Sequence, residues 1–242
     1  MSDEESAKKR EQAQRIREMF AAIATRYDLL NHLLSGNVDR RWRRLLVKRV
    51  GAMLPASDGR ILDVACGTGD LSLALVAGTH AELVGLDFCR PMLDIAAAKS
   101  KELGLTISFV EGDALNLPFS DQSFDGVSIA FGLRNLASLE EGLRELLRIL
   151  RPGGTVAVLE FSRPQTPILR TLFRLYFTKL LPLFGGLISG SKSAYQYLPD
   201  SVSRFPDQSS LAEIMRGIGF TEVTFQNLTG GIAALHLGRR AK

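Results

Sequence analysis

The sequence predicts an α/β fold in which a mostly parallel sheet is covered by helices on both faces. Short apolar runs alternate with segments of helical periodicity, and several of the runs end in glycine or an acidic residue. The five runs lie at 61–64, 83–87, 109–111, 124–131 and 150–159. With 242 residues, 45% of them hydrophobic, the chain is expected to form one domain with a sizeable core.

The first run leads into a glycine-containing turn, and a helical pattern follows from Leu71. Gly67 and Gly69 allow the backbone of this turn to approach a ligand closely. In an open α/β sheet, the carboxyl end of a strand is where ligands bind. The dinucleotide fingerprint needs a third glycine where this chain has Ser72. The turn therefore predicts a nucleotide-like ligand and argues against a dinucleotide.

Charge separates the two ligands that suit such a turn. Asp63 and Asp70 flank it and would repel a pyrophosphate, which favours an uncluttered helix N-terminus. They would attract the ammonium and sulfonium groups of S-adenosylmethionine. Asp70 alone also has a simpler interpretation, because an acid in the first turn of a helix complements the helix dipole.

The second and third runs end in acids at the same predicted edge. Asp87 follows Gly67 by twenty residues, and a carboxylate there accepts hydrogen bonds from ribose hydroxyls. Asp113 and Ala114 follow the third run, where the carboxylate is expected to meet an adenine amino group. The fourth run leads into Gly132, and the fifth is a Pro-Gly-Gly turn into a buried strand. Each segment alone is weak evidence for a ligand-binding α/β sheet, but the five together, in this order and with helical segments between them, are strong evidence.

In this order the five segments resemble the class I S-adenosylmethionine-dependent methyltransferases. Three signatures more narrowly resemble the C-methyltransferases of menaquinone and ubiquinone biosynthesis: 24–31 (Ala-Thr-Arg-Tyr-Asp-Leu-Leu-Asn), 131–135 (Phe-Gly-Leu-Arg-Asn) and 227–236. The resemblance spans about 19–238, and 131–135 is its most specific part. It implies a Rossmann-like seven-stranded sheet with an antiparallel last strand, and S-adenosylmethionine as cofactor.

The resemblance and the strand-end positions together indicate the site residues. Those expected to bind the cofactor are Asp63, Gly67, Thr68, Gly69, Asp87, Asp113 and Ala114. Some relatives contact the cofactor through a serine where this chain has Ala130, so that contact is not expected here.

The implied substrate is a polyprenylated isoprenoid quinol, methylated on a ring carbon. Ionising a phenolic hydroxyl pushes electron density onto the neighbouring carbon, and a cation lowers the pKa of that hydroxyl. Arg134 is our candidate, because it follows the fourth run, next to where the methyl group should point. A guanidinium stays protonated, so Arg134 is not expected to be the direct base. Asn135 and Tyr27 are expected to complete the network. The structural alternatives are that Arg134 pairs with Asp121 or Glu140, and that Tyr27 is a packed core aromatic.

No metal site is expected. Cys66 and Cys89 provide neither a disulfide framework nor zinc spacing, and they are interpreted as small, reduced packing residues. The three histidines, His32, His80 and His236, form no cluster of metal-ligand type. His236 is a possible base, but a histidine late in a strand is more often a hydrogen-bonded core residue.

Residues 4–50 are predicted to be mainly helical, with Asp39 as a possible N-cap. Basic residues crowd around Trp42: Arg40, Arg41, Arg43, Arg44, Lys48 and Arg49. Such a patch suits nucleic acid, an anionic membrane surface or a solvated helix face. Aromatic residues make up 7% of the chain, fewer than a platform for stacking single-stranded nucleic acid needs. No nucleic-acid partner is therefore expected.

A second segment outside the sheet pattern, 164–206, contains the apolar stretch 168–184. Its interruptions argue against a membrane-spanning helix: Arg170, Arg174, Lys179 and Pro182. We expect a lid over an apolar substrate or a helix lying on a membrane; a helix packed on the core is the alternative. The C-terminal part is predicted as a helix over 208–217 and a hairpin with strands 222–228 and 232–238.

One methyltransferase domain over 1–242 is thus expected, with a helical cap (4–50), a cofactor-binding core (51–163), a lid (164–206) and a C-terminal part (207–242). The first residues are charged and lack the apolar core of a signal peptide, so a cytoplasmic protein with transient contacts to the inner membrane face is expected. A homodimer is left open. The alternatives are a methyltransferase acting on RNA or protein, and a non-catalytic cofactor-binding partner of another enzyme.

Overall fold

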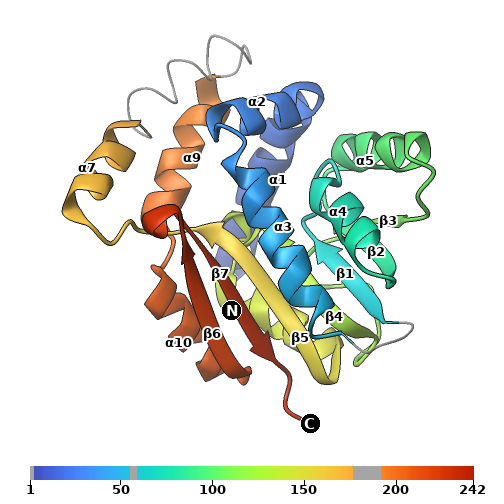
Figure 1. Cartoon of the computed structure of the whole chain (residues 1–242). Helices are drawn as coiled ribbons and strands as arrows, with labels where there is room; N and C mark the ends of the chain where they lie inside the picture. The colour runs from blue at the N-terminus through green and yellow to red at the C-terminus, as the bar shows by residue number, and fades with distance from the viewer. Residues whose placement is uncertain (1–2, 55–58, 177–191) are drawn as a thin grey trace.

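The computed structural model describes residues 3–54, 59–176 and 192–242, which are built around one seven-stranded sheet (Figure 1). The strands are β1 (Arg60–Val64), β2 (Glu82–Asp87), β3 (Ser108–Glu111), β4 (Phe124–Ala130), β5 (Leu150–Phe161), β6 (Thr221–Leu228) and β7 (Ala233–Arg239). They lie in the order β3-β2-β1-β4-β5-β7-β6. Strands β1 to β5 run parallel, and β7 is antiparallel to both β5 and β6. The predicted fold class, including the antiparallel last strand, is confirmed.

Helices cover both faces of the sheet (Figure 1). Those of the described ranges are α1 (Asp3–Ile23), α2 (Tyr27–Leu34), α3 (Val38–Gly51), α4 (Asp70–Gly78), α5 (Arg90–Glu102), α6 (Leu139–Ile149), α7 (Pro167–Leu175), α9 (Lys192–Arg204) and α10 (Gln208–Ile218). None of them combines the length and hydrophobicity needed to cross a bilayer.

The central strands are apolar on both sides because each side meets a helical layer. In β5, Val156 and Val158 pack into a cluster with α6 and α10, whereas Ala157 and Leu159 pack into a cluster with α3 and α4. A strand covered on both faces reads as a continuous apolar run rather than an alternating one. This explains why the runs could be recognised in the sequence.

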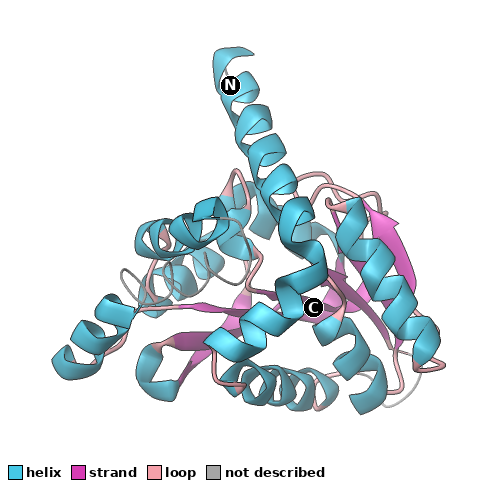
Figure 2. Ribbon diagram, turned by 90° about the horizontal axis from the view of Figure 1, so that it is seen from above, coloured by secondary structure: helices cyan, strands magenta, loops and turns pink. Residues whose placement is uncertain are grey.

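Helix α3 packs on a face of the sheet, whereas α1 and α2 contribute Phe20 and Tyr27 to the pockets at the carboxyl ends of the parallel strands. Helix α1 contacts α5 and α9, and its N-terminal half extends away from the body of the molecule (Figure 2). Helix α3 begins one residue after Asn37, which makes no side-chain cap bond, so the prediction that Asp39 is the N-cap is wrong. The Asp39 carboxylate is turned instead toward α2, where Ser35 donates to it at 2.6 Å and His32 contacts it at 2.8 Å.

The apolar stretch predicted over 168–184 begins as α7, and its part from residue 177 lies outside the described residues. Helix α7 exposes Ile168, Leu172 and Leu175, which fall on one helical face. It does not line the pockets described below; within the described part of the insertion, α9 does.

Candidate active site

Two adjoining pockets open where β1, β2 and β4 end. Six residues line both pockets: Phe20, Tyr27, Ala65, Gly67, Ala130 and Phe131. The sequence-predicted residues that line at least one pocket are Tyr27, Asp63, Gly67, Thr68, Asp87, Asp113, Ala114, Arg134 and Asn135. Gly69 lines neither. Strand order alone therefore brings most of the expected side chains to one place.

The first pocket is built around the end of β2. The Asp87 carboxylate is buried and accepts hydrogen bonds from the backbone amides of Gly67 at 2.8 Å and Cys89 at 2.9 Å. Burial raises the pKa of Asp87, and these backbone amides oppose the rise. Asp113 and Ala114 lie across this pocket, with Asp113 accepting from the amide of Leu115 at 2.9 Å.

The two glycines of the first turn have different reasons to be glycine. Both have positive φ, +55° at Gly67 and +82° at Gly69. A Cβ on Gly67 would meet no atom within 4 Å, so this backbone faces open space in the pockets. A Cβ on Gly69 would lie 2.9 Å from the Cβ of Ala96 on α5. Gly67 therefore leaves room for a ligand, whereas Gly69 permits close packing of the turn on α5.

The second pocket contains a buried acid at the end of β1. Asp63 is 1% exposed and accepts hydrogen bonds from Ser72 at 2.6 Å and Ser128 at 2.8 Å. Burial raises the pKa of Asp63 to about 6, although the two hydroxyls oppose the rise. Near neutral pH this carboxylate is a negative charge held in a protein environment that resists it.

Asp70, which was predicted to favour a positively charged ligand beside the turn, is paired with a cation of the protein. Lys99 on α5 contacts it at 2.5 Å and also binds Asp28 of α2 at 2.9 Å. Burial opposes the charge on Lys99, but these two carboxylates raise its pKa overall. Thr68 donates to the other oxygen of Asp28. The charge of Asp70 is thus balanced by the protein, and it ties the turn to the N-terminal helices.

Arg134 lies at the end of β4, on the short 3-10 turn Leu133–Asn135. Its Nη1 donates to Glu160 of β5 at 2.7 Å and to the carbonyl of Phe131 at 2.5 Å. Both members of the ion pair are buried, with side chains 7% and 1% exposed. The buried Nε of Arg134 has no hydrogen-bond partner among the described residues. One donor of a well-anchored guanidinium is therefore left over, and such groups are rare in folded proteins.

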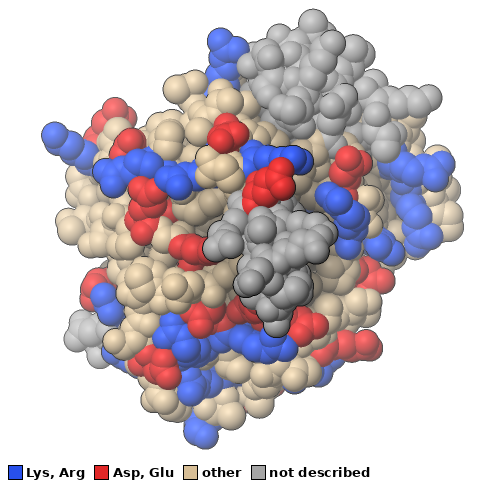
Figure 3. All heavy atoms as spheres, turned by 180° about the vertical axis from the view of Figure 1, so that it is seen from behind, with Lys and Arg blue, Asp and Glu red and all other residues tan. Residues whose placement is uncertain are grey.

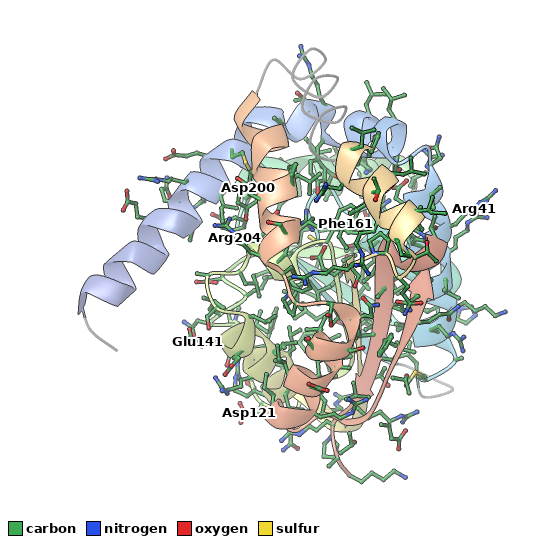
Figure 4. All side chains as sticks on the ribbon, turned by 90° about the vertical axis from the view of Figure 1, so that its left-hand side faces the viewer. Arg41, Asp121, Glu141, Phe161, Asp200 and Arg204 are labelled. Carbon is green, nitrogen blue, oxygen red and sulfur yellow. The ribbon has the colours of Figure 1, made fainter. Side chains whose placement is uncertain are left out.

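The structural alternatives for Arg134 were wrong about its partner. Asp121 pairs with Arg148, and Glu140 pairs with Arg144 on the surface. Asp121 lies toward the far end of the molecule from Phe161, the residue that follows Glu160 (Figure 4). The pairing with Glu160 places a buried acid in the site that the sequence analysis missed. The sequence cue that could have revealed Glu160 is that it is an acidic residue near the end of the otherwise apolar strand β5.

Asn135 and Tyr27 both line the first pocket. The amide of Asn135 donates to the Phe131 carbonyl at 3.3 Å, and its oxygen accepts from the hydroxyl of Tyr197 on α9 at 3.1 Å. Burial raises the pKa of Tyr27, although Arg134 opposes this, so its hydroxyl remains protonated near neutral pH. No sequence signal pointed to Tyr197, because its position depends on how α9 packs.

The backbone is strained where the two pockets join. Phe131 and Ala65, which follow β4 and β1, have φ values of +57° and +52°. Left-handed conformations are uncommon for residues with side chains and cluster at functional sites. Gly132 permits the close approach of these two strand ends, because a Cβ on it would lie 2.5 Å from the Cβ of Ala65.

The remaining histidine and cysteine candidates are placed as follows. His236 is buried in β7, contacts the Gln208 carbonyl through Nε2 at 2.8 Å and lines neither pocket; burial lowers its pKa. It is a core residue rather than a base. Cys66 lines the second pocket, and burial raises its pKa well above the usual value, which keeps it a thiol. Within the described ranges, no group of three His, Cys, Asp or Glu side chains is arranged to hold a metal.

Comparisons with known proteins agree on one family. A profile of the ubiE/COQ5 methyltransferase family matches residues 8–240. The chain is 50% identical to the demethylmenaquinone methyltransferase of Thermus thermophilus, over 92% of this chain and 100% of that one. It is 45% identical to the ubiquinone/menaquinone biosynthesis C-methyltransferase UbiE of Geotalea uraniireducens, over 95% of this chain and 98% of that one.

Similarity to solved structures supports the fold. Phosphoethanolamine N-methyltransferase 2 of Haemonchus contortus, solved with S-adenosyl-L-methionine, superposes with a TM-score of 0.62. The match covers 83% of this chain and 52% of that one, at 16% identity.

Proposed function

The chain belongs to the ubiE/COQ5 methyltransferase family, and we propose that it transfers a methyl group from S-adenosylmethionine to a ring carbon of a polyprenylated quinol. The substrate is 2-demethylmenaquinol, with the 2-methoxy-6-polyprenyl-benzoquinol of ubiquinone biosynthesis as a second acceptor. The observation that carries the proposal is the buried, anchored Arg134 with one unpaired N–H, at the strand end where the two pockets meet.

The paired pockets suit the shape and chemistry of the donor. Asp87 has acceptor capacity for the ribose hydroxyls beside the open backbone of Gly67, and Asp113 lines the same pocket, which supports its assignment to the adenine amino group. The second pocket, with Asp63 and Thr68, takes the amino-acid end. When bound, S-adenosylmethionine supplies a methyl group already activated by a sulfonium. The protein's task is therefore to orient the two reactants and to make the acceptor carbon nucleophilic.

Acceptor activation is assigned to Arg134. Glu160 balances its charge, so the pair presents no net positive charge to the pocket. The Nε–H is nevertheless a directed donor, and a donor aimed at a developing phenolate favours ionisation of the hydroxyl. Tyr27, protonated and partly buried, is a second donor, and the side-chain oxygen of Asn135 accepts a hydrogen bond from the hydroxyl of Tyr197. Arginine itself does not act as the base.

The walls of the second pocket favour an aromatic, apolar acceptor over RNA or protein. Trp42, Phe131 and Phe161 form one ring cluster there, with ring centroids 4.9 to 6.4 Å apart. Figure 3 shows the face turned away from α3, and on that face basic and acidic side chains are intermingled. A non-catalytic role is disfavoured by the unpaired donor of Arg134, which a purely structural ion pair does not require.

The same acceptor implies contact with a membrane surface, because its polyprenyl tail resides there. Large apolar side chains exposed within the described ranges number seven, and five lie on α2 and α7: Leu29, Leu33, Ile168, Leu172 and Leu175. Both helices lie toward the end of the molecule where the parallel strands finish (Figure 1). We propose that they rest at the interface of the cytoplasmic leaflet.

The membrane contact is tested by sedimentation with anionic vesicles. Leu172→Glu is expected to reduce binding several-fold, because it places a charge in the apolar contact. Leu103→Glu is the matched control, since Leu103 is exposed to a similar degree but follows α5. Equal loss in both variants, or in neither, would remove α7 from the contact.

The reaction is tested by mass spectrometry with chemically reduced demethylmenaquinol and demethylated benzoquinol supplied separately. We expect methylation of at least the naphthoquinol, and none of either quinone when oxidised, since an oxidised ring is electrophilic. Transfer to neither quinol while the donor still binds would redirect the assignment to RNA or protein substrates. A chain that binds no donor would leave only a non-catalytic role.

A further inference from the structure

The basic run on α3 divides into an outer and an inner part. Arg41 projects from the surface (Figure 4), as do the exposed side chains of Arg40 and Arg44. The side chain of Arg43 is only 13% exposed and lines the second pocket. It shares a helical face with buried Val47, four residues later, which explains why this arginine turns inward.

Arg43 is held in place through one nitrogen of its guanidinium group, Nη1. Its Nη1 pairs with Asp39 and lies 3.5 Å from Asp70. Asp39 is itself fixed by Ser35 and His32, and these contacts together hold its pKa down despite the opposing effect of burial. A guanidinium has five N–H donors in a rigid fork. The contacts that the described residues make with Arg43 use Nη1, so the remaining edge of the fork is left for the pocket.

The anchoring network also fixes Arg43 relative to the cofactor turn. Asp70, which it approaches, is the first residue of α4 and is bound by Lys99. Lys99 in turn binds Asp28, which accepts from Thr68 of the turn. Arg43 is thus held in place from both the N-terminal helices and the glycine turn, although more than twenty residues separate it from that turn.

The charges around Arg43 match a zwitterion. Three acids line the second pocket, Asp39, Asp63 and Asp70, together with two arginines. Both arginines are paired with an acid, Arg134 with Glu160 and Arg43 with Asp39, and Arg43 is the one that lies beside the turn, 3.5 Å from Asp70. An amino-acid end carries an ammonium, which the acids attract, and a carboxylate, which they repel. The carboxylate needs a cation of its own, and Arg43 is the lining cation beside the turn.

We infer that Arg43 binds the carboxylate at the amino-acid end of the methyl donor, while the Asp63 carboxylate, which has no cationic partner among the described residues, attracts its ammonium. The inference rests on the proposed function and adds a donor-recognition residue to it. An arginine fork binds a carboxylate through two parallel hydrogen bonds, which fixes orientation as well as affinity. Arg43 would thereby fix the position of the donor between Gly67 and the aromatic cluster of Trp42, Phe131 and Phe161.

Two ligands that differ by the carboxylate alone test this directly. S-adenosylhomocysteine carries the carboxylate, and S-adenosyl-3-thiopropylamine lacks it but keeps the ammonium. Their affinities are measured by calorimetry on the full chain, on Arg43→Met and Arg43→Lys, and on Arg44→Met as the exposed control. In Arg43→Met we expect about a 10- to 100-fold loss for S-adenosylhomocysteine. The decarboxylated ligand should change by about twofold or less, and Arg43→Lys should recover part of the loss, as expected for a charge-assisted contact.

Equal weakening of both ligands would mean that Arg43 only supports the fold of the N-terminal helices. Unchanged affinity for both would mean that the carboxylate lies elsewhere. If Arg43→Met folds poorly because Asp39 is left without its partner, the double variant Asp39→Asn/Arg43→Met is measured in its place, because it removes the charge of that buried acid as well. If the unmodified chain binds neither ligand, the proposed function itself fails.

Discussion

The donor end and the acceptor end of the site are built in different ways. At the donor end, Asp87 is held by backbone amides of turns that directly follow β1 and β2, including that of Gly67. At the acceptor end, Arg134 is held by Glu160, a side chain of the neighbouring strand 26 residues away. Backbone amides are fixed wherever the turn forms, whereas side-chain pairs depend on packing. The donor end is therefore set by local structure and the acceptor end by long-range structure.

This difference predicts a separation of effects. Substitutions at the donor end should change affinity for the donor, and substitutions at the acceptor end should change turnover at a saturating donor concentration. A variant that altered both equally would show that the two ends act as one unit.

The largest effect is expected for Arg134→Ala. Loss of a donor aimed at the developing phenolate should lower kcat by about 10²- to 10³-fold. The affinity for S-adenosylhomocysteine should stay within about twofold, because the free N–H of Arg134 is assigned to the acceptor. Turnover by mass spectrometry and affinity by calorimetry measure the two quantities.

The control for that variant must deal with Glu160, which is left as an unpaired buried acid. Breaking a buried pair in this way costs about 3–5 kcal/mol of stability. Arg134→Met/Glu160→Gln removes both charges and should restore folding without restoring turnover. Arg144→Ala, at an exposed pair, should leave both quantities unchanged. Near-normal turnover in Arg134→Ala would end its assignment as the activating residue.

Asp87→Ala should produce the next largest effect, at the opposite end of the site. We expect about a 100-fold weaker affinity for S-adenosylhomocysteine, because the acceptors for the ribose are lost and the Gly67 amide loses its partner. Turnover at saturating donor should be largely kept. Asp94→Ala, at an exposed ion pair on α5, is the control. Unchanged affinity in Asp87→Ala would contradict the ribose assignment.

The pH dependence of stability should reveal Asp63, the buried acid of the donor end. The pKa of Asp63 is raised to about 6 from its ordinary value of 3.8, so the folded state holds this proton more tightly than the unfolded state does. The contribution of Asp63 is complete below about pH 4 and is lost as pH rises to about 6, by roughly 2–3 kcal/mol.

That dependence is isolated by comparing the unmodified chain with Asp63→Asn. Asparagine keeps a partner for at least one of the two serines but does not titrate. The stability of Asp63→Asn relative to the unmodified chain should therefore rise between pH 4 and pH 7 in urea unfolding. A difference that stays constant with pH would show that the folded environment leaves this carboxyl unperturbed.

Tyr27→Phe should have the smallest effect of the four. Tyr27 lines both pockets, so the effect of this substitution shows which of the two ends its hydroxyl serves. Removal of the hydroxyl should lower kcat about tenfold by loss of one donor and leave the donor affinity unchanged, because the ring still packs on Phe20. A loss of donor affinity instead would assign Tyr27 to the donor end.

Much of the donor end was predictable because its cues are local. Apolar runs, glycine turns and an acid at a strand end follow from the chemistry of neighbouring residues, and strand order then brings Asp63, Asp87 and Asp113 together. The prediction for Asp70 was incomplete because local cues do not reveal a partner on another helix. Its position was correct, but Lys99, which balances its charge, comes from another helix.

The sequence by itself determined the order of the strands along the chain, the antiparallel closing hairpin and the residues that end each strand, because periodicity and turn chemistry act over a few residues. The tertiary structure decided which charges are paired. Arg134 binds Glu160 rather than Asp121, Asp39 binds side chains rather than capping a helix, and Tyr197 reaches Asn135. Such contacts depend on how the helices dock on the sheet, and docking is set by burial of apolar surface that no local pattern encodes.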